Sequence, residues 1–115
     1  MMDCVFCKII GGQIPSEFVY QDNEVVAFKD INPEAPVHLL IVPRQHIISV
    51  TDVNTERLSV LMGHMVLVAN KLAKANGVDK QGFRLIINAG PEGGQLVQHL
   101  HMHLLGGKQL VNRMG

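Results

Sequence analysis

Three histidines alternate with apolar residues near the C-terminal end of the chain. The run reads His99-Leu100-His101-Met102-His103-Leu104-Leu105. A period of two is typical of a β-strand, in which successive side chains leave opposite faces. We therefore predict a strand over residues 99–105 whose leucines and methionine face a core. Its three imidazoles would line the other face, where they suit proton, phosphoryl or metal chemistry. The alternative is an edge strand whose polar face happens to be histidine.

The spacing of the three imidazoles narrows that chemistry. Neighbours on one strand face lie about 6.6–6.8 Å apart, so the backbones of His99 and His103 would be about 13 Å apart. Two adjacent members can share a metal ion, whereas all three cannot do so unless the strand bends. His101 is flanked on both sides and can act as a nucleophile that its neighbours orient. Neutral imidazole attacks phosphorus and leaves it again, so a displacement can proceed in two steps.

A glycine-rich segment lies just upstream of the histidines. It reads Asn88-Ala89-Gly90-Pro91-Glu92-Gly93-Gly94-Gln95. Three glycines in five positions allow a tight turn and close approach of the backbone to a ligand. Backbone N–H groups in such a turn can bind phosphate oxygens. A plain turn is the alternative for the segment by itself, but its place before the three histidines indicates a phosphate site beside a nucleophile.

Together these motifs resemble the histidine-triad superfamily, and the flanking segments are similar to its Hint branch, the purine nucleoside phosphoramidases. The similar segments are residues 30–38, residues 41–47, Gly93-Gly94-Gln95 and Leu105-Gly106-Gly107. The resemblance covers nearly the whole chain. Leu96 departs from it, because the family often has at this position a serine that hydrogen-bonds the phosphate or the leaving group. This departure bears on rate and leaving-group preference.

The predicted fold is α+β, in one domain over residues 1–115. Five strands would form an antiparallel sheet, over residues 17–21, 25–29, 38–42, 83–88 and 99–105, with a two-residue turn at Asp22-Asn23. A short helix is expected over residues 5–10. One long helix would begin at the capping residue Asn54 and end at Asn76-Gly77.

The long helix predicts a homodimer. Its apolar stripe consists of Leu58, Leu61, Met62, Met65, Ala69, Leu72 and Ala73. Val60 and Leu67 fall outside the narrowest stripe, and the interior Gly63 costs about 1 kcal/mol relative to alanine and often marks close backbone approach. We therefore expect a partner helix across a two-fold axis, with the two sheets joined as the family resemblance implies. Ordinary exposed apolar residues are the alternative.

The resemblance implies roles for residues that are ambiguous by themselves. Asp30 reads first as a turn-forming aspartate, but the matching family residue holds the ribose. Phe6, Ile9, Ile14 and Ile31, simply core residues otherwise, would form an apolar slot for a purine. The other nucleotide-binding residues would be Asn88, Gly94, Gln95, Leu96, His101 and His103. The catalytic residues would be His101, His103, His99 and, as a supporting member of the hydrogen-bonding relay, His38. We assign no chemistry to His64 on the long helix.

Cys4 and Cys7 form a Cys-x-x-Cys pair near the N-terminus. The βαβ setting of a thioredoxin-type redox pair is absent, and a zinc half-site needs two more ligands. Some histidine-triad proteins complete such a site with a histidine after the third strand and the first triad histidine. Those residues would be His46 and His99 here, so a structural zinc is one outcome and two free thiols are the other.

Composition excludes several classes of partner. The chain has ten basic and ten acidic residues, so no basic stripe indicates nucleic-acid binding. No apolar run approaches the length of a membrane span, and the N-terminus lacks the features of a signal peptide. Two cysteines only three positions apart do not indicate a disulfide scaffold, so we expect a cytoplasmic location.

The function best supported by these residues is hydrolysis of a substituted, amidate-type nucleoside 5′-monophosphate through a nucleotidyl-histidine intermediate, with AMP or GMP derivatives as ligands. No cofactor is expected to be required for catalysis. Three alternatives stay open: a dinucleoside polyphosphate hydrolase, a nucleotide-binding regulatory or scaffold protein with incidental turnover, and a zinc hydrolase that uses His101 and His103 as ligands. Only the last predicts activity that chelators abolish.

Overall fold

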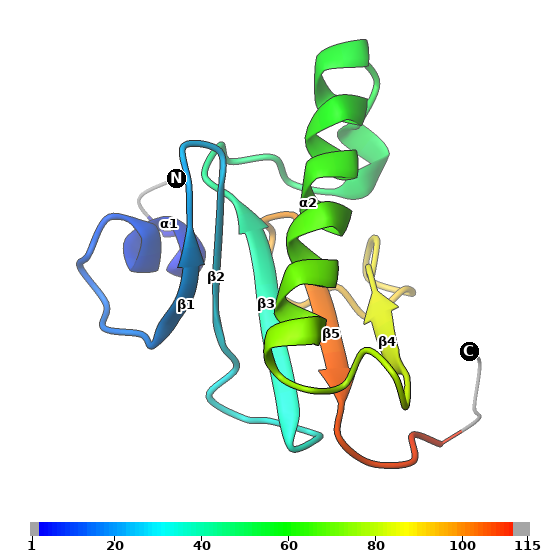
Figure 1. The fold of residues 1–115 in the computed structure, drawn as a ribbon. Coiled ribbons are helices and arrows are strands. Elements are labelled where there is room, and N and C mark those ends of the chain that lie inside the picture. The colour runs from blue at the N-terminus through cyan, green and yellow to red at the C-terminus, as the bar shows by residue number, and fades with distance from the viewer. Residues whose placement is uncertain (1–2, 112–115) are drawn as a thin grey trace.

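A five-stranded antiparallel sheet organises the chain (Figure 1). The computed structural model describes residues 3–111. The strands lie in the order β1-β2-β3-β5-β4, and every neighbouring pair is antiparallel. The elements are α1 (Val5–Ile10), β1 (Phe18–Gln21), β2 (Val25–Lys29), β3 (Val37–Pro43), the 3-10 turn η1 (Val50–Asp52), α2 (Glu56–Ala75), β4 (Phe83–Ile86) and β5 (Met102–Gly106). The predicted α+β class, with one long and one short helix, is confirmed.

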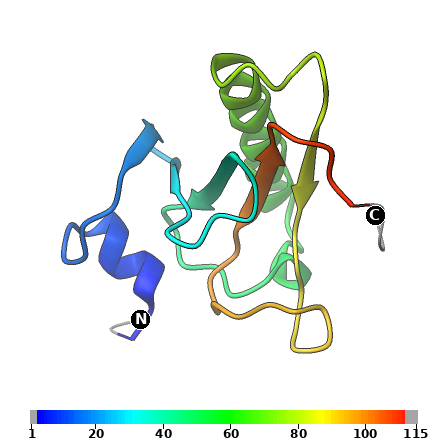
Figure 2. The ribbon, with the colours of Figure 1, turned by 90° about the horizontal axis from the view of Figure 1, so that it is seen from below.

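Each face of the sheet is covered by one helix, as the view along the sheet in Figure 2 shows. Alternate residues of the central strands therefore enter different cores, because side chains of a strand point to opposite faces. The core under α2 contains Val25, Ala27, Leu39, Ile41, Met102 and Leu104 from the strands. The smaller core under α1 contains Phe6, Ile9, Val26, Phe28, Leu40 and Val42. Burial on both faces explains the continuous apolar runs of β2 and β3.

The histidine strand begins later than the sequence predicts. The ladder between β3 and β5 starts at the pair Ile41 and Met102, so residues 99–101 lie outside regular strand. The reason is Pro43, which has no N–H to donate and whose carbonyl oxygen accepts a hydrogen bond from His99 Nε2 instead (2.9 Å). Leu100 N donates to the Ile47 carbonyl (2.6 Å). The alternation of side chains nevertheless continues, since Leu100 remains buried in the α2 core.

Three other predicted boundaries are wrong by small amounts. The hairpin turn is centred on Asn23-Glu24, because Asp22 Oδ1 accepts hydrogen bonds from the backbone of Glu24 and Val25 (2.8 Å each). The first helical turn of α2 is capped by Thr55, whose hydroxyl accepts from Leu58 N (3.2 Å), and not by Asn54. Strand β4 ends at Ile86, two residues before Asn88. Asn76 caps the end of α2 as predicted.

A polar cluster around Asp22 ties the β1–β2 turn to α2. The Asp22 carboxylate accepts hydrogen bonds from Tyr20 Oη (2.7 Å) and His64 Nε2 (2.6 Å), and Arg44 Nε donates to the Asp22 carbonyl (2.7 Å). Burial opposes the charge, but the hydrogen bonds from Tyr20, the turn backbone and His64 prevail and hold the pKa of the Asp22 carboxyl well below its usual range. His64 thus has a structural partner. Within residues 3–111, neither helix combines the length and apolarity needed to cross a bilayer.

Candidate functional site

A cavity of about 550 Å³ opens on the α1 face of the sheet. Helix α1, strands β2, β3 and β5 and the glycine-rich loop all contribute to its wall. Ten residues predicted to bind nucleotide line it: Phe6, Ile9, Ile14, Asp30, Ile31, Asn88, Gly94, Leu96, His101 and His103. His38 also lines it, and so do Phe28, Leu40 and Val97, which sequence analysis missed. Phe28 and Leu40 could have been found from the alternation in β2 and β3, which puts them on the same face as His103.

The environment of His101 determines which ring nitrogen is free. His101 Nδ1 lies 2.7 Å from the His99 carbonyl oxygen, which can only accept a hydrogen bond, so Nδ1 carries the proton. The lone pair is therefore on Nε2. The edge of the Phe6 ring packs against the imidazole, with the ring centroids 5.1 Å apart. A buried imidazole with a bare Nε2 at a cavity wall is suited to nucleophilic attack.

The other two imidazoles of the cavity form a directed pair. The backbone N–H of Glu34 donates to His38 Nδ1 (3.1 Å), so His38 carries its proton on Nε2. That nitrogen lies 3.0 Å from His103 Nδ1 and 3.3 Å from the Asp30 carboxylate. His103 Nδ1 thus accepts, and His103 must carry its own proton on Nε2. Burial, followed by the nearby His101 and His38 imidazoles, lowers the pKa of His103 to about 4.

The glycine-rich loop is held by one buried side chain. Gln95 does not line the cavity; its Nε2 donates to the carbonyls of Ile48 (2.6 Å) and Val97 (3.1 Å), and its Oε1 accepts from Gly90 N (3.0 Å). Gly94 has a φ of 82°, a conformation that favours glycine. A Cβ at Gly93 would collide with the Ala89 carbonyl. Gln95 therefore shapes the loop, while the backbone of the loop faces the cavity.

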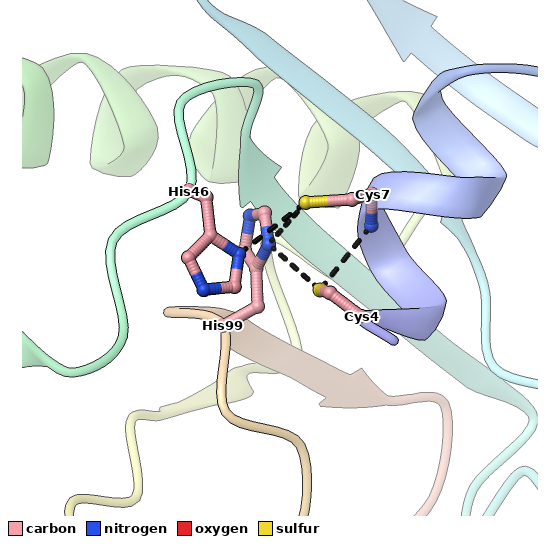
Figure 3. A group of neighbouring side chains, drawn as sticks. All are labelled: Cys4, Cys7, His46 and His99. Carbon is pink, nitrogen blue, oxygen red and sulfur yellow. Dashed lines mark hydrogen bonds between the residues drawn. The ribbon is translucent and has the colours of Figure 1, made fainter. Parts of the chain in front are cut away.

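A second cluster of side chains, none of which lines the cavity, carries atoms that can bind a metal ion. Cys4, Cys7, His46 and His99 point toward one another (Figure 3), and their Sγ and Nδ1 atoms all lie within 4.8 Å of one another. Cys4 Sγ is 3.3 Å from His99 Nδ1, and Cys7 Sγ is 3.3 Å from His46 Nδ1. Tetrahedral zinc with S and N ligands puts those atoms about 3.6 Å apart. Because His99 Nε2 donates to Pro43, its Nδ1 is free to bind a metal.

The donor set therefore fits a structural zinc ion. Burial, then the hydrogen bond and charge of Cys4, raises the pKa of the Cys7 thiol, so metal binding would displace a proton. Cys4 Sγ also accepts from Cys7 N at the start of α1. His99 itself is fully buried and does not line the cavity. It contributes its imidazole to the cysteine cluster and its carbonyl to His101, so the two sites share one residue.

Comparisons with protein families, with known proteins and with solved structures all find proteins similar to this chain. The family described as "Scavenger mRNA decapping enzyme C-term binding" matches residues 3–115. A purine nucleoside phosphoramidase from Escherichia coli K12 is 50% identical over 108 residues, which is 94% of this chain and 90% of that protein. A histidine triad protein from Clostridium difficile superposes with a TM-score of 0.93 at 50% identity, covering 98% of this chain and 97% of that one. A HIT family hydrolase from Legionella pneumophila gives 0.94 at 46% identity, covering 98% and 100%.

The low pKa of His103 leads to a testable prediction. In histidine NMR titrations, His103 should stay neutral down to about pH 4, whereas an unfolded histidine takes up its proton near pH 6.5. Between these values the unfolded chain binds the extra proton, so this residue makes the fold less stable as pH falls from 6.5 toward 4. His103→Gln should reduce the fall in melting temperature over that range. A His103 that titrates near pH 6.5 would contradict the burial argument.

Proposed function

The chain belongs to the histidine-triad superfamily, and from that premise we propose that it is a hydrolase of substituted nucleoside 5′-monophosphates. The proposed substrates are amidates, in which an amine is bonded to the α-phosphorus, and the proposed intermediate is a nucleotidyl-histidine. The observation that carries the proposal is the bare Nε2 of His101, held at the cavity wall by the bond from Nδ1 to the His99 carbonyl. The relative named as a purine nucleoside phosphoramidase supports the choice of P–N bond.

The cavity has a place for each part of such a substrate. Phe6, Ile9, Ile14 and Ile31 provide an apolar slot for a purine ring, and the Asp30 carboxylate at the same end can accept hydrogen bonds from ribose hydroxyls. The phosphate then lies between His101, His103 and the glycine-rich loop, where Asn88 can donate to an oxygen. Backbone N–H groups of that loop stabilise the charge that develops at phosphorus.

The chemistry divides between His101 and His103. His101 Nε2 attacks the α-phosphorus, the P–N bond breaks, and the departing nitrogen receives a proton from His103. His103 is neutral in the free protein, but the charge of a bound phosphate raises its affinity for a proton, and the Asp30 carboxylate near His38 favours the same change. A water molecule then attacks phosphorus, returns a proton to His103 and releases the monophosphate from His101. No metal ion takes part in either displacement.

A structural zinc site is a separate part of the proposal. Cys4, Cys7, His46 and His99 would hold the ion, which would cross-link α1 to the segments that follow β3 and precede β5. Thiolate sulfur and imidazole nitrogen are the ligands that zinc prefers in structural sites. Their convergence through contacts of 3.3 to 3.6 Å supports the assignment.

We also propose a homodimer in the cytoplasm. On the side of α2 that faces away from the sheet, Val60 is 68% exposed and Leu67 is 50% exposed. Gly63 lies between them, and, apart from its chain neighbours and the backbone of its own helix, no atom of residues 3–111 comes within 4 Å of the position its Cβ would take. A helix of a second copy would cover these side chains. The cytoplasmic location rests on the two unpaired cysteines.

The first prediction from this proposal concerns the nucleophile. His101→Ala should abolish the covalent intermediate and lower turnover of an adenosine phosphoramidate by several orders of magnitude. AMP should still bind within roughly tenfold of wild type, about 1.4 kcal/mol, because the slot, Asp30 and the loop remain. His103→Ala should slow turnover less and leave a nucleotidyl-enzyme detectable after acid quenching, and His99→Ala should act mainly on stability. If His101→Ala kept a tenth of the wild-type rate, a metal-bound water would be the better nucleophile.

The zinc proposal is tested by metal analysis of the purified protein, which should find about one zinc per chain. Cys4→Ser should lose the metal and lower the melting temperature more than it lowers specific activity. His64→Gln, which changes a histidine outside the cluster, is the control and should keep the zinc. A metal-free wild type whose stability is the same after Cys4→Ser would show that the four residues form no metal site.

The dimer proposal is tested by analytical ultracentrifugation. The wild type should sediment as a dimer at micromolar concentration, and Val60→Glu should shift it toward monomer because it places a charge in the apolar contact. Glu56→Gln, a polar change on the same helix, should leave the dimer intact. Sedimentation of the wild type as a monomer at that concentration would refute this part of the proposal.

A further inference from the structure

Cys4 and Cys7 are two thiols that can react with each other as well as bind a metal ion. Both are unpaired and half-buried, and their Sγ atoms lie within 4.8 Å of each other. Cys4 caps α1 and Cys7 lies in its first turn, where Cys7 N donates to Cys4 Sγ (3.3 Å). Figure 3 shows both side chains directed toward the same two imidazoles. A disulfide between them therefore requires rearrangement of this one turn only.

A cavity of about 410 Å³ gives access to one of these thiols. Cys4 is part of its wall and Cys7 is not. The rest of the wall consists of Asp3, Val5, His46, Ile48, Leu96, Val97 and Gln98. A small uncharged oxidant such as hydrogen peroxide can therefore reach Cys4 from solvent, and Cys7 then lies beside the oxidised sulfur. An accessible cysteine with a second cysteine next to it is typical of redox-sensing sites.

The fold indicates that such a disulfide would act on this protein and not on a substrate. Every neighbouring pair of strands in the sheet is antiparallel, so the two cysteines lack the βαβ setting of thioredoxin-type oxidoreductases. Disulfides of cytoplasmic proteins are usually transient, because the thiol pools of that compartment reduce them. With the proposed location, this favours reversible oxidation over a permanent cross-link.

Phe6 lies between the two cysteines in the chain and connects them to the nucleotide cavity. Its ring lines that cavity, as does Ile9 of the same helix. The centroid of the Phe6 ring is 5.1 Å from that of His101 and 5.9 Å from that of His99. A helix of six residues is not stable by itself in water. The position of α1, and with it this part of the cavity wall, therefore depends on contacts with the rest of the chain.

Oxidation would remove some of the contacts that hold α1 in place. In the reduced protein, Cys4 Sγ is 3.3 Å from His99 Nδ1. Cys7 Sγ is likewise 3.3 Å from His46 Nδ1. A disulfide sulfur has no hydrogen to donate to these nitrogens, and because the metal ligand is the thiolate, oxidation and zinc binding exclude each other. Helix α1 would then be held mainly by the packing of its apolar residues, and the wall that it provides for a nucleotide would loosen.

We propose that Cys4 and Cys7 form a reversible oxidation site for hydrogen peroxide, whose disulfide form binds nucleotide more weakly. Cys4 Sγ attacks one peroxide oxygen, the O–O bond breaks, and a sulfenic acid and one water are formed. Cys7 Sγ then attacks the sulfur of the sulfenic acid, the S–O bond breaks, and the S–S bond and a second water are formed. The two thiol protons end in the two waters, and the peroxide takes up the two electrons.

This inference goes beyond the proposed function, on which it rests only for the identity of the nucleotide. Neither His101 nor His103 takes part in the oxidation. The oxidised protein should therefore show a larger change in KM for an adenosine phosphoramidate than in kcat.

The test treats the reduced protein with an equimolar amount of hydrogen peroxide and then reduces it again with dithiothreitol. Mass spectrometry of the N-terminal peptide should find the loss of two hydrogens and a bond between Cys4 and Cys7. The Kd of AMP, measured by calorimetry, should rise about tenfold on oxidation, equivalent to about 1.4 kcal/mol, and should return on reduction. Release of zinc, followed with a chromogenic chelator, should accompany formation of the disulfide.

Cys4→Ser is the control for oxidation elsewhere in the chain. Its Kd for AMP should be the same before and after peroxide treatment, because the disulfide cannot form. The variant keeps all six methionines, so it also measures any effect of methionine oxidation on AMP binding.

A measurement on the wild type alone provides a second test. A reduced form that binds AMP about tenfold more tightly than the oxidised form must itself be favoured by AMP by the same factor. The reduction potential of the cysteine pair, measured in glutathione buffers, should therefore rise by about 30 mV at saturating AMP.

Two free thiols after peroxide treatment, or a sulfinic acid in place of the disulfide, would overturn the oxidation site. A disulfide that leaves the Kd of AMP unchanged, or a potential that AMP does not shift, would overturn its effect on the nucleotide cavity. An equal rise in Kd for Cys4→Ser would do the same. Reduced protein that binds no AMP would contradict the proposed function, and the regulation of nucleotide binding would be refuted with it.

Discussion

The arrangement of the whole site depends on the hydrogen bond from His101 Nδ1 to the His99 carbonyl, 2.7 Å long. This bond decides the tautomer of His101 and so leaves the lone pair of Nε2 facing the cavity. The bond to His101 can form because residues 99–101 lie outside regular strand. In a regular sheet, the His99 carbonyl would instead accept a backbone hydrogen bond from a neighbouring strand. Pro43 ends the ladder because it lacks an N–H, and its carbonyl is engaged by His99 Nε2 (2.9 Å). The end of β3 thus positions the nucleophile in the segment that leads into β5.

Helix α1 connects this arrangement to the purine slot and to the cysteine cluster. Six residues are too few for a helix to be stable by itself in water, so its position must come from tertiary contacts. Phe6 packs edge-on against Phe28, with ring centroids 5.5 Å apart, and against His99 and His101. Cys4 and Cys7 hold the start of the same helix next to His46 and His99. A metal ion at these four residues would therefore support the wall of the nucleotide cavity as well as the histidine that orients the nucleophile.

Burial and neighbouring charges determine the protonation state of His103 in the cavity. The imidazoles of His38, His101 and His103 are packed together and largely shielded from water. This keeps His103 neutral until a bound phosphate supplies negative charge.

The sequence by itself determined the fold class, the family and the residue types of the site, because alternation, glycine placement and Cys-x-x-Cys spacing are local patterns. The prediction that His101 is the nucleophile came from its place in the middle of the three histidines. Only the tertiary structure decided the tautomers, since these depend on the Glu34 N–H and on the carbonyls of His99 and Pro43, backbone groups present at every position and invisible to sequence patterns. It also placed Gln95 inside the loop instead of at the cavity wall, and it gave His64 a partner 42 residues away. These contacts join segments distant in the chain, and their geometry depends on how the sheet brings those segments together.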